Sequence, residues 1–147
     1  QARLVAQAVQ AMWRNGLAID VGLCCEEWKS FLLTRRSGNF TIARGGWIGD
    51  YNDPTTFLDL FRSGSLNNFC RWSNGDYDRE MDSAAAETDP AKRIRHLQNA
   101  EAILLKEVPI IPLYFETNRH RVSRRISGWN ANILDYHLWQ NIRLGDN

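Results

Sequence analysis

One short stretch of the chain brings together side chains of opposite charge and an indole. Arg44, Trp47 and Asp50 follow one another at intervals of three residues. A guanidinium group binds a carboxylate through two parallel hydrogen bonds, and a carboxylate makes a charge-assisted hydrogen bond to an ammonium group. An indole adds a large contact area with few rotatable bonds. The stretch therefore predicts a site for a ligand with one positive and one negative end.

The segments on either side of this stretch predict how it is held. Residues 40–44 have the composition of a short strand, and Pro54 begins a short helix that carries two phenylalanines and a leucine. In open α/β sheets, ligands bind outside the carboxyl ends of the strands. We therefore expect the site in the turn between this strand and this helix.

Periodicity and capping signals predict the other elements. Asp89 followed by Pro90 indicates a helix start, because the aspartate caps the first amides and proline lacks the amide that would need a partner. The predicted helices cover residues 1–14, 26–36, 77–87 and 89–106, and the predicted strands cover residues 17–23, 40–44, 108–115 and 119–122. Helices that alternate with strands favour a layered α/β lobe.

The stretch around Trp47 resembles a motif of the bacterial oligopeptide-binding proteins, extracellular receptors that pass peptides to ATP-driven importers. In that family Ala-Arg-x-Gly-Trp is followed by x-x-Asp-Tyr-Asn, an acidic residue and proline. Residues 43–54 of this chain run Ala-Arg-Gly-Gly-Trp-Ile-Gly-Asp-Tyr-Asn-Asp-Pro. Further matches lie at residues 27–31, 34–35, 89–93, 100–101 and 108–114, so the resemblance extends over nearly the whole chain.

The resemblance implies an architecture. Members of the family have two lobes joined by a hinge and are several times longer than this chain of 147 residues. We expect the C-terminal portion of such a receptor: a partial periplasmic binding protein type II-like lobe of α/β class, with a mixed sheet flanked by helices. Residues 1–127 would belong to the peptide-binding lobe, and residues 128–147 would return toward the first lobe. A dimer or a domain swap would cover surface meant for missing neighbours.

The resemblance also implies a role for each site residue. Asp50 would bind the N-terminal ammonium group of a peptide. Arg44 and Arg35 would bind its carboxylate, and Trp47 and Trp28 would line side-chain pockets. The residues themselves leave other roles open, since Asp50 also suits a helix cap, Arg35 a solvent-facing position and Trp28 a place in the core. Neither a catalytic residue nor a cofactor is expected.

Several alternatives concern the ligand or the activity. The same scaffold would serve for a murein peptide, haem, a nickel chelate or a sugar. An enzyme is the more distant alternative, with Asp50 and Asp53 as the acid pair of a hydrolase. If the resemblance holds, the partners are an oligopeptide and the membrane subunits of an ABC importer, and the location is periplasmic. No signal peptide is visible in the sequence, and no apolar run approaches the roughly 20 residues that cross a bilayer.

Composition narrows these classes further. Eighteen basic and seventeen acidic residues give a net charge of +1, which provides no general field for nucleic acid. The three histidines are isolated in the sequence, with no carboxylate partner at a useful spacing, so we expect no metal site. The three cysteines match no zinc-binding spacing and are expected to be buried free thiols.

Overall fold

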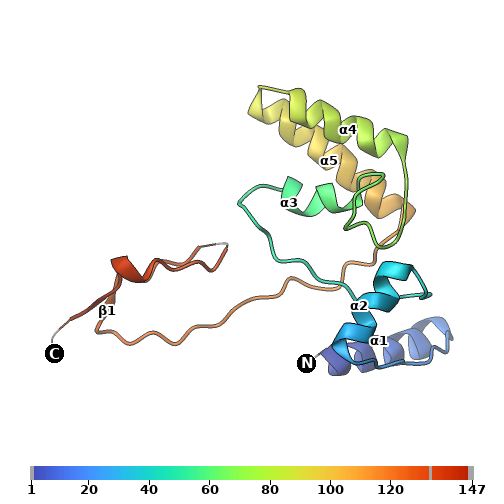
Figure 1. Ribbon diagram of the computed structural model, residues 1–147, viewed down its shortest axis with the longest axis horizontal. Coiled ribbons are helices and arrows are strands. Elements are labelled where there is room, and N and C mark those ends of the chain that lie inside the picture. Colours follow the sequence, from blue (N-terminus) through green and yellow to red (C-terminus); the bar gives the residue numbers. More distant parts are fainter. Residues whose placement is uncertain (1, 133, 146–147) are drawn as a thin grey trace. The chain divides into compact units, whose positions relative to one another are not determined.

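The computed structural model describes residues 2–132 and 134–145, which divide between two compact units, Gln1–Thr41 and Ile42–Asn147. The first unit holds two helices, and the second holds the other helices and a small sheet (Figure 1). Among the described residues, no helix combines the length and the apolar character required to cross a membrane.

The first unit consists of α1 (Ala2–Leu17), the loop that follows it, and α2 (Trp28–Ser37). Glu27 caps α2, since its carboxylate accepts hydrogen bonds from the amides of Lys29 at 2.8 Å and Ser30 at 3.4 Å. The loop is tied back to α1 by a 2.6 Å hydrogen bond from the Gln10 amide to the Val21 carbonyl. Both helices confirm the sequence prediction to within three residues at their ends.

The second unit begins with the helical segments α3 (Thr55–Leu58) and η1 (Asp59–Phe61), and continues with α4 (Gly75–Ala86) and α5 (Pro90–Glu107). α4 and α5 pack side by side (Figure 1). Asn74 caps α4 and Asp89 caps α5, each through a side-chain oxygen that accepts from two backbone amides. The predicted start of α5 at the Asp89-Pro90 pair is confirmed.

The core of the second unit lies between α3, α4 and α5. Tyr77 is completely buried, and its hydroxyl donates a hydrogen bond of 2.5 Å to the carbonyl of Leu58. This hydrogen bond offsets the desolvation cost of burying the hydroxyl, and it also satisfies a backbone carbonyl that needs a donor. The other buried apolar residues in the described part of the chain are Leu58, Met81, Ala84, Leu97, Ala100 and Leu104.

The described sheet is a short hairpin near the C-terminus. β1 (Ile126–Ser127) pairs antiparallel with β2 (Arg143–Leu144), with Ile126 opposite Leu144, and η2 (Trp139–Asn141) precedes β2. Gly128 follows β1 with φ 79°, and a Cβ added there would lie 1.9 Å from the carbonyl oxygen of Asn141. Only glycine fits this left-handed position and this close backbone approach.

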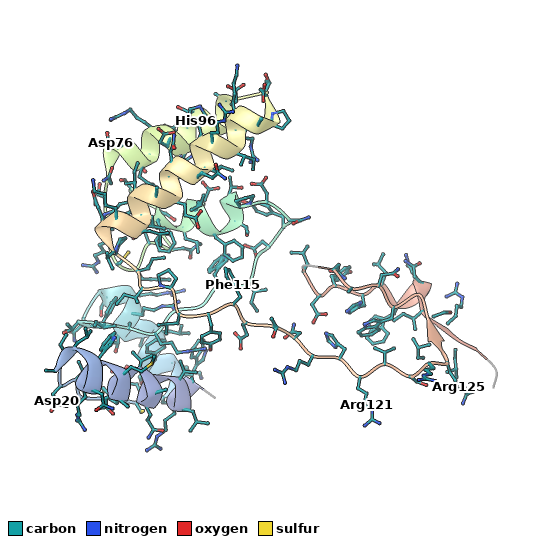
Figure 2. The ribbon with its side chains drawn as sticks, turned by 180° about the vertical axis from the view of Figure 1, so that it is seen from behind. Asp20, Asp76, His96, Phe115, Arg121 and Arg125 are labelled. Carbon is teal, nitrogen blue, oxygen red and sulfur yellow. The ribbon has the colours of Figure 1, made fainter. Side chains whose placement is uncertain are left out.

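The four predicted strands are not found in the described sheet. Residues 17–23, 40–44, 108–115 and 119–122 are irregular or extended, because a strand needs a neighbour for its backbone hydrogen bonds and no described segment pairs with them. Val108 has φ 54° and ends α5, so it cannot begin a strand. Phe115 is 97% exposed and projects from the extended segment after α5 (Figure 2).

Candidate ligand-binding site

Asp50 is held by its backbone and leaves its carboxylate free of partners in the described part of the chain. Its amide donates a hydrogen bond of 2.9 Å to the hydroxyl of Thr56, a buried residue of α3. Gly49 allows this approach, since a Cβ there would lie 3.3 Å from both Thr56 and Phe57. The Asp50 side chain is exposed, and no hydrogen bond or ion pair to its carboxylate is found among residues 2–132 and 134–145.

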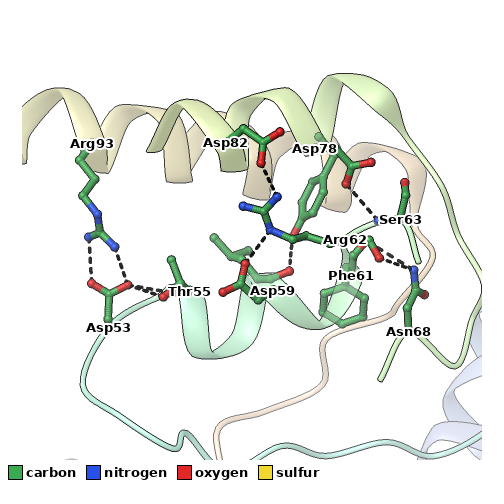
Figure 3. A network of polar contacts seen from close by, with 12 residues as sticks. Asp53, Thr55, Asp59, Phe61, Arg62, Ser63, Asn68, Asp78, Asp82 and Arg93 are labelled. Carbon is green, nitrogen blue, oxygen red and sulfur yellow. Dashed lines mark hydrogen bonds and ion pairs between the residues drawn. The ribbon is translucent and has the colours of Figure 1, made fainter. Parts of the chain in front are cut away.

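Asp53, three residues later, is bound on both carboxylate oxygens. Arg93 of α5 donates to them at 2.8 and 2.9 Å (Figure 3). The same carboxylate accepts from the amide of Thr55 at 3.0 Å and from its hydroxyl at 2.7 Å. Asp53 therefore caps the start of α3, which is the role that the sequence left open for Asp50.

The contacts of Asp53 also bear on the hydrolase alternative. The hydrogen bond from Arg93 is the largest cause that holds the pKa of Asp53 far below its usual value of 3.8; burial opposes it, and the hydrogen bonds from Thr55 reinforce it. A general acid must carry a proton near the working pH. Asp53 stays ionised there and its oxygens are occupied, so Asp53 is not suited to be the general acid of such a pair.

Neighbouring ion pairs fix the helices that follow the turn. Arg62 donates to Asp59 at 2.8 Å and to Asp82 of α4 at 2.7 Å (Figure 3). The Asn68 amide donates to the carbonyls of Phe61, Arg62 and Trp72, at 3.4, 3.2 and 2.7 Å. These bonds fix the loop after η1 and connect η1 to α4, so the helical segments that follow the Asp50 turn are held in place.

Arg44 and Trp47 lie on the irregular segment before Asp50. Arg44 is exposed and makes no hydrogen bond or ion pair with any described residue, and Trp47 is 38% exposed. Both side chains are therefore accessible to a ligand. The structure places Arg44, Trp47 and Asp50 in the second unit, on one continuous segment of chain.

Arg35 and Trp28 belong to the first unit, on α2. The guanidinium carbon of Arg35 lies 5.8 Å from the centre of the Phe31 ring, within the range of a cation–π contact. Burial, and then the neighbouring charge of Arg36, lower the pKa of Arg35. Trp28 is 60% exposed and contacts Phe31 with ring centres 5.9 Å apart. Within its own unit, Trp28 is thus a surface residue and not a core residue.

The cysteines differ from the prediction in one respect. Cys24, Cys25 and Cys70 are free, as expected, but all of them are exposed. Cys24 and Cys25 lie in the loop between α1 and α2, and neither of those helices contains a fully buried residue. The expected burial is wrong for all three, and for Cys24 and Cys25 the reason is that no core forms beside them.

Sequence reasoning missed a cluster around two histidines. The prediction that the histidines are isolated is wrong for His120 and His137, whose ring centres lie 5.6 Å apart and whose Nε2 atoms meet Asp135 at 2.7 and 2.9 Å. A returning loop brings His120 to the other two, which no local spacing reveals. The Asp135-x-His137 pair was the available signal, since it places a carboxylate and an imidazole two residues apart.

Comparison with known proteins decides the family. Residues 1–69 match the family described as bacterial extracellular solute-binding proteins, family 5 Middle. The chain belongs to this family. It is 38% identical over 128 residues to the periplasmic murein peptide-binding protein MppA of Escherichia coli, and 41% identical over 115 residues to the oligopeptide-binding protein OppA of Bacillus subtilis. These matches cover 87% and 78% of the chain.

Family members also share the fold. The crystal structure of Haemophilus influenzae OppA in complex with RPPGFSPFR matches 99% of this chain with a TM-score of 0.85 and 34% identity. The predicted class, a partial periplasmic binding protein type II-like lobe, is therefore confirmed. The chain spans 24% of the length of MppA, 21% of Bacillus OppA and 29% of Haemophilus OppA.

Proposed function

We propose that this chain is part of an extracytoplasmic receptor that binds short peptides and delivers them to the membrane subunits of an ABC importer. The relatives named above are peptide-binding proteins, two of them described as oligopeptide-binding or bound to a peptide. The main support for this proposal is a difference between two aspartates of the same turn. Both carboxylate oxygens of Asp53 accept hydrogen bonds from Arg93, whereas the carboxylate of Asp50 has no partner among the described residues.

Asp50 suits the N-terminal amine of the peptide. A carboxylate that no protein group neutralises attracts an ammonium group, and the hydrogen bond between two ions is about twice as strong as a neutral one. The amide of Asp50 is anchored to Thr56, so the backbone that carries this side chain is held in place before a ligand arrives. Such preorganisation lowers the entropic cost of binding.

Arg44 and Arg35 would take the carboxylate of a short peptide. Both guanidinium groups stay charged at any physiological pH and can bind a carboxylate with two parallel hydrogen bonds. Trp47 and Trp28 are exposed within their own units. They would provide apolar contact for the side chains of the peptide without strong selectivity among them. Binding through the two termini makes the receptor tolerant of sequence.

The working event would be reversible closure of two lobes over the peptide, without a chemical step. Residues 1–127 would lie in the peptide-binding lobe and residues 128–147 would return to the first lobe, which stays a prediction. The expected dimer or domain swap of the chain also stays a prediction.

Calorimetry with matched peptides tests the role of Asp50. Trialanine with a free amine should bind about 10- to 100-fold more tightly than N-acetyl-trialanine, the range for losing one bond to a charged group. In Asp50→Asn this difference should nearly vanish. Asp76→Asn is the control, because Asp76 is an exposed residue of α4 that pairs with Arg79 away from the turn. Equal affinities for the two peptides in the parent receptor would exclude the amine role.

A murein peptide is the second candidate ligand. The observation in its favour is the similarity to MppA, whose name gives that specificity. Competition between a murein tripeptide and trialanine for the same receptor separates the two candidates, since the preferred ligand will displace the other at a lower concentration. The Asp50→Asn comparison applies to both.

A further inference from the structure

A cluster of three side chains near the C-terminus has the composition of a metal site and lies outside the proposed peptide site. It consists of His120, Asp135 and His137, whose nitrogen and oxygen donor atoms all lie within 4.8 Å of one another. The Nε2 atoms of the two histidines lie 2.7 and 2.9 Å from the same oxygen, Oδ1 of Asp135. Two imidazoles and a carboxylate thus converge on one point.

We propose that His120, Asp135 and His137 bind a divalent transition-metal ion of the zinc class through two imidazole nitrogens and one carboxylate oxygen. Neutral imidazole and carboxylate are preferred zinc ligands, and three protein ligands leave a further position for water or an external group. This proposal is independent of the peptide-binding function.

The donor geometry requires little rearrangement. Ligand atoms of a tetrahedral zinc site with bonds of about 2.0–2.2 Å lie about 3.3 Å apart. The separations from Oδ1 of Asp135 to the two Nε2 atoms, 2.7 and 2.9 Å, are about half an ångström shorter than that. Each histidine would bind the ion as a neutral imidazole, through an unprotonated Nε2 and with its proton on Nδ1, and any displaced proton would pass to solvent.

Outer contacts orient each of the donors. The amide of Asn118 donates to Oδ2 of Asp135 at 2.6 Å, which leaves Oδ1 directed at the histidines. Trp129 stacks on His137 with ring centres 3.7 Å apart and planes at 21°, and lies 5.3 Å from the ring of His120. Contacts of this kind restrict the rotation of side chains that bind a metal.

The local backbone explains why Asp135 and His137 point to one place. The amide of Asp135 donates to the carbonyl of Asn132 at 3.1 Å, and the Asn132 side chain bonds the amide and the carbonyl of Tyr136 at 3.0 and 2.9 Å. Asp135 itself has φ 53°, a conformation that aspartate tolerates better than most residues. This turn holds Asp135 and His137 on the same side.

The cluster is protected but reachable. The side chain of His137 is 10% exposed, that of Asp135 29% and that of His120 38%. His120 and Trp129 also line an open hollow of about 230 Å³. An ion can therefore reach the cluster from the His120 side, and His137 is the ligand best shielded from bulk water.

Zinc titration of the tag-free full chain tests the proposal. Cys24, Cys25 and Cys70 are replaced by serine throughout, because exposed thiols would bind zinc themselves. Calorimetry with Zn²⁺ should show saturable binding of one ion per chain. His120→Gln and His137→Gln should each weaken it by at least about tenfold, the lower end of what even outer partners of metal ligands cost. Equal affinity in parent and variants, or no saturable binding in the parent, would overturn the proposal.

The remaining histidine of the chain gives a matched control. His96 of α5 pairs with Glu80 at 2.7 Å, away from His120 and His137 in the sequence and outside the cluster, so His96→Gln should bind zinc like the parent. Carbethoxylation of the unmutated histidines, followed by mass spectrometry, needs no variant to fold. Zinc should protect His120 and His137 and leave His96 reactive. Equal reactivity with and without zinc would sink the assignment.

Discussion

Arg93 and Asp53 lie 40 residues apart in the sequence and form an ion pair with two hydrogen bonds, of 2.8 and 2.9 Å. The pair joins α5 to the start of α3, on which the amide of Asp50 is anchored. Both side chains are about 30% exposed. The position proposed to bind a peptide amine is therefore set in part by a residue that would not touch the peptide.

Replacing Arg93 by Met should lower the free energy of unfolding by about 1–2 kcal/mol, because the pair is partly shielded and has both hydrogen bonds. Urea denaturation followed by circular dichroism measures this. Arg79→Met is the matched control: its ion pair with Asp76 is exposed, at 74% and 68%, and its loss should cost less than about 0.5 kcal/mol. Equal effects of the two changes would contradict the structural role of Arg93.

The stability of the protein should depend on the ionisation of Asp53 at low pH. The hydrogen bond from Arg93 lowers the pKa of Asp53 in the folded state below its usual value of 3.8. The contribution to stability is then fully present above the unfolded-state pKa and is lost as the pH falls through the folded-state pKa. Below about pH 4, the unfolding free energy of the parent should fall more steeply than that of Asp53→Asn. Parallel pH profiles for the two proteins would show that the pair does not form.

Tyr77→Phe should destabilise the second unit by about 1–2 kcal/mol, because it leaves the buried carbonyl of Leu58 without its hydrogen bond. Burial raises the pKa of Tyr77, so its hydroxyl should also titrate after those of exposed tyrosines in an alkaline absorbance scan. Tyr51→Phe serves as the control, since its hydroxyl meets Thr55 at 3.2 Å on the surface. An unchanged urea midpoint in Tyr77→Phe would refute the prediction.

Local signals predicted the helices well and the strands poorly. The start of α5 at Asp89 and Pro90 depends on contacts within four residues, and the sequence contains all of them. A strand depends on a partner that can lie anywhere in the chain, so the apolar composition of residues 108–115 did not suffice. β1 and β2 were missed for the same reason, since each has two residues and no alternation to detect.

The candidate site was foreseen in its residue types but not in how the aspartates divide their roles. The sequence suggested only Asp50 of the two as a possible helix cap, whereas Asp53 takes that role and is also bound by Arg93, which comes from a distant helix. The gathering of His120 with Asp135 and His137 likewise needed the course of the chain. Spacing in the sequence could indicate only the local pair, Asp135 and His137.

The absence of a side chain at Gly128 affects residues that lie well beyond its own contacts. One added carbon would press on the carbonyl of Asn141 and force apart the two strands that frame residues 129–141. Trp129, Asp135 and His137 all lie within that frame. A single methyl group added at Gly128 would thus disable the proposed metal-binding cluster at a distance, although none of the ligands is itself replaced.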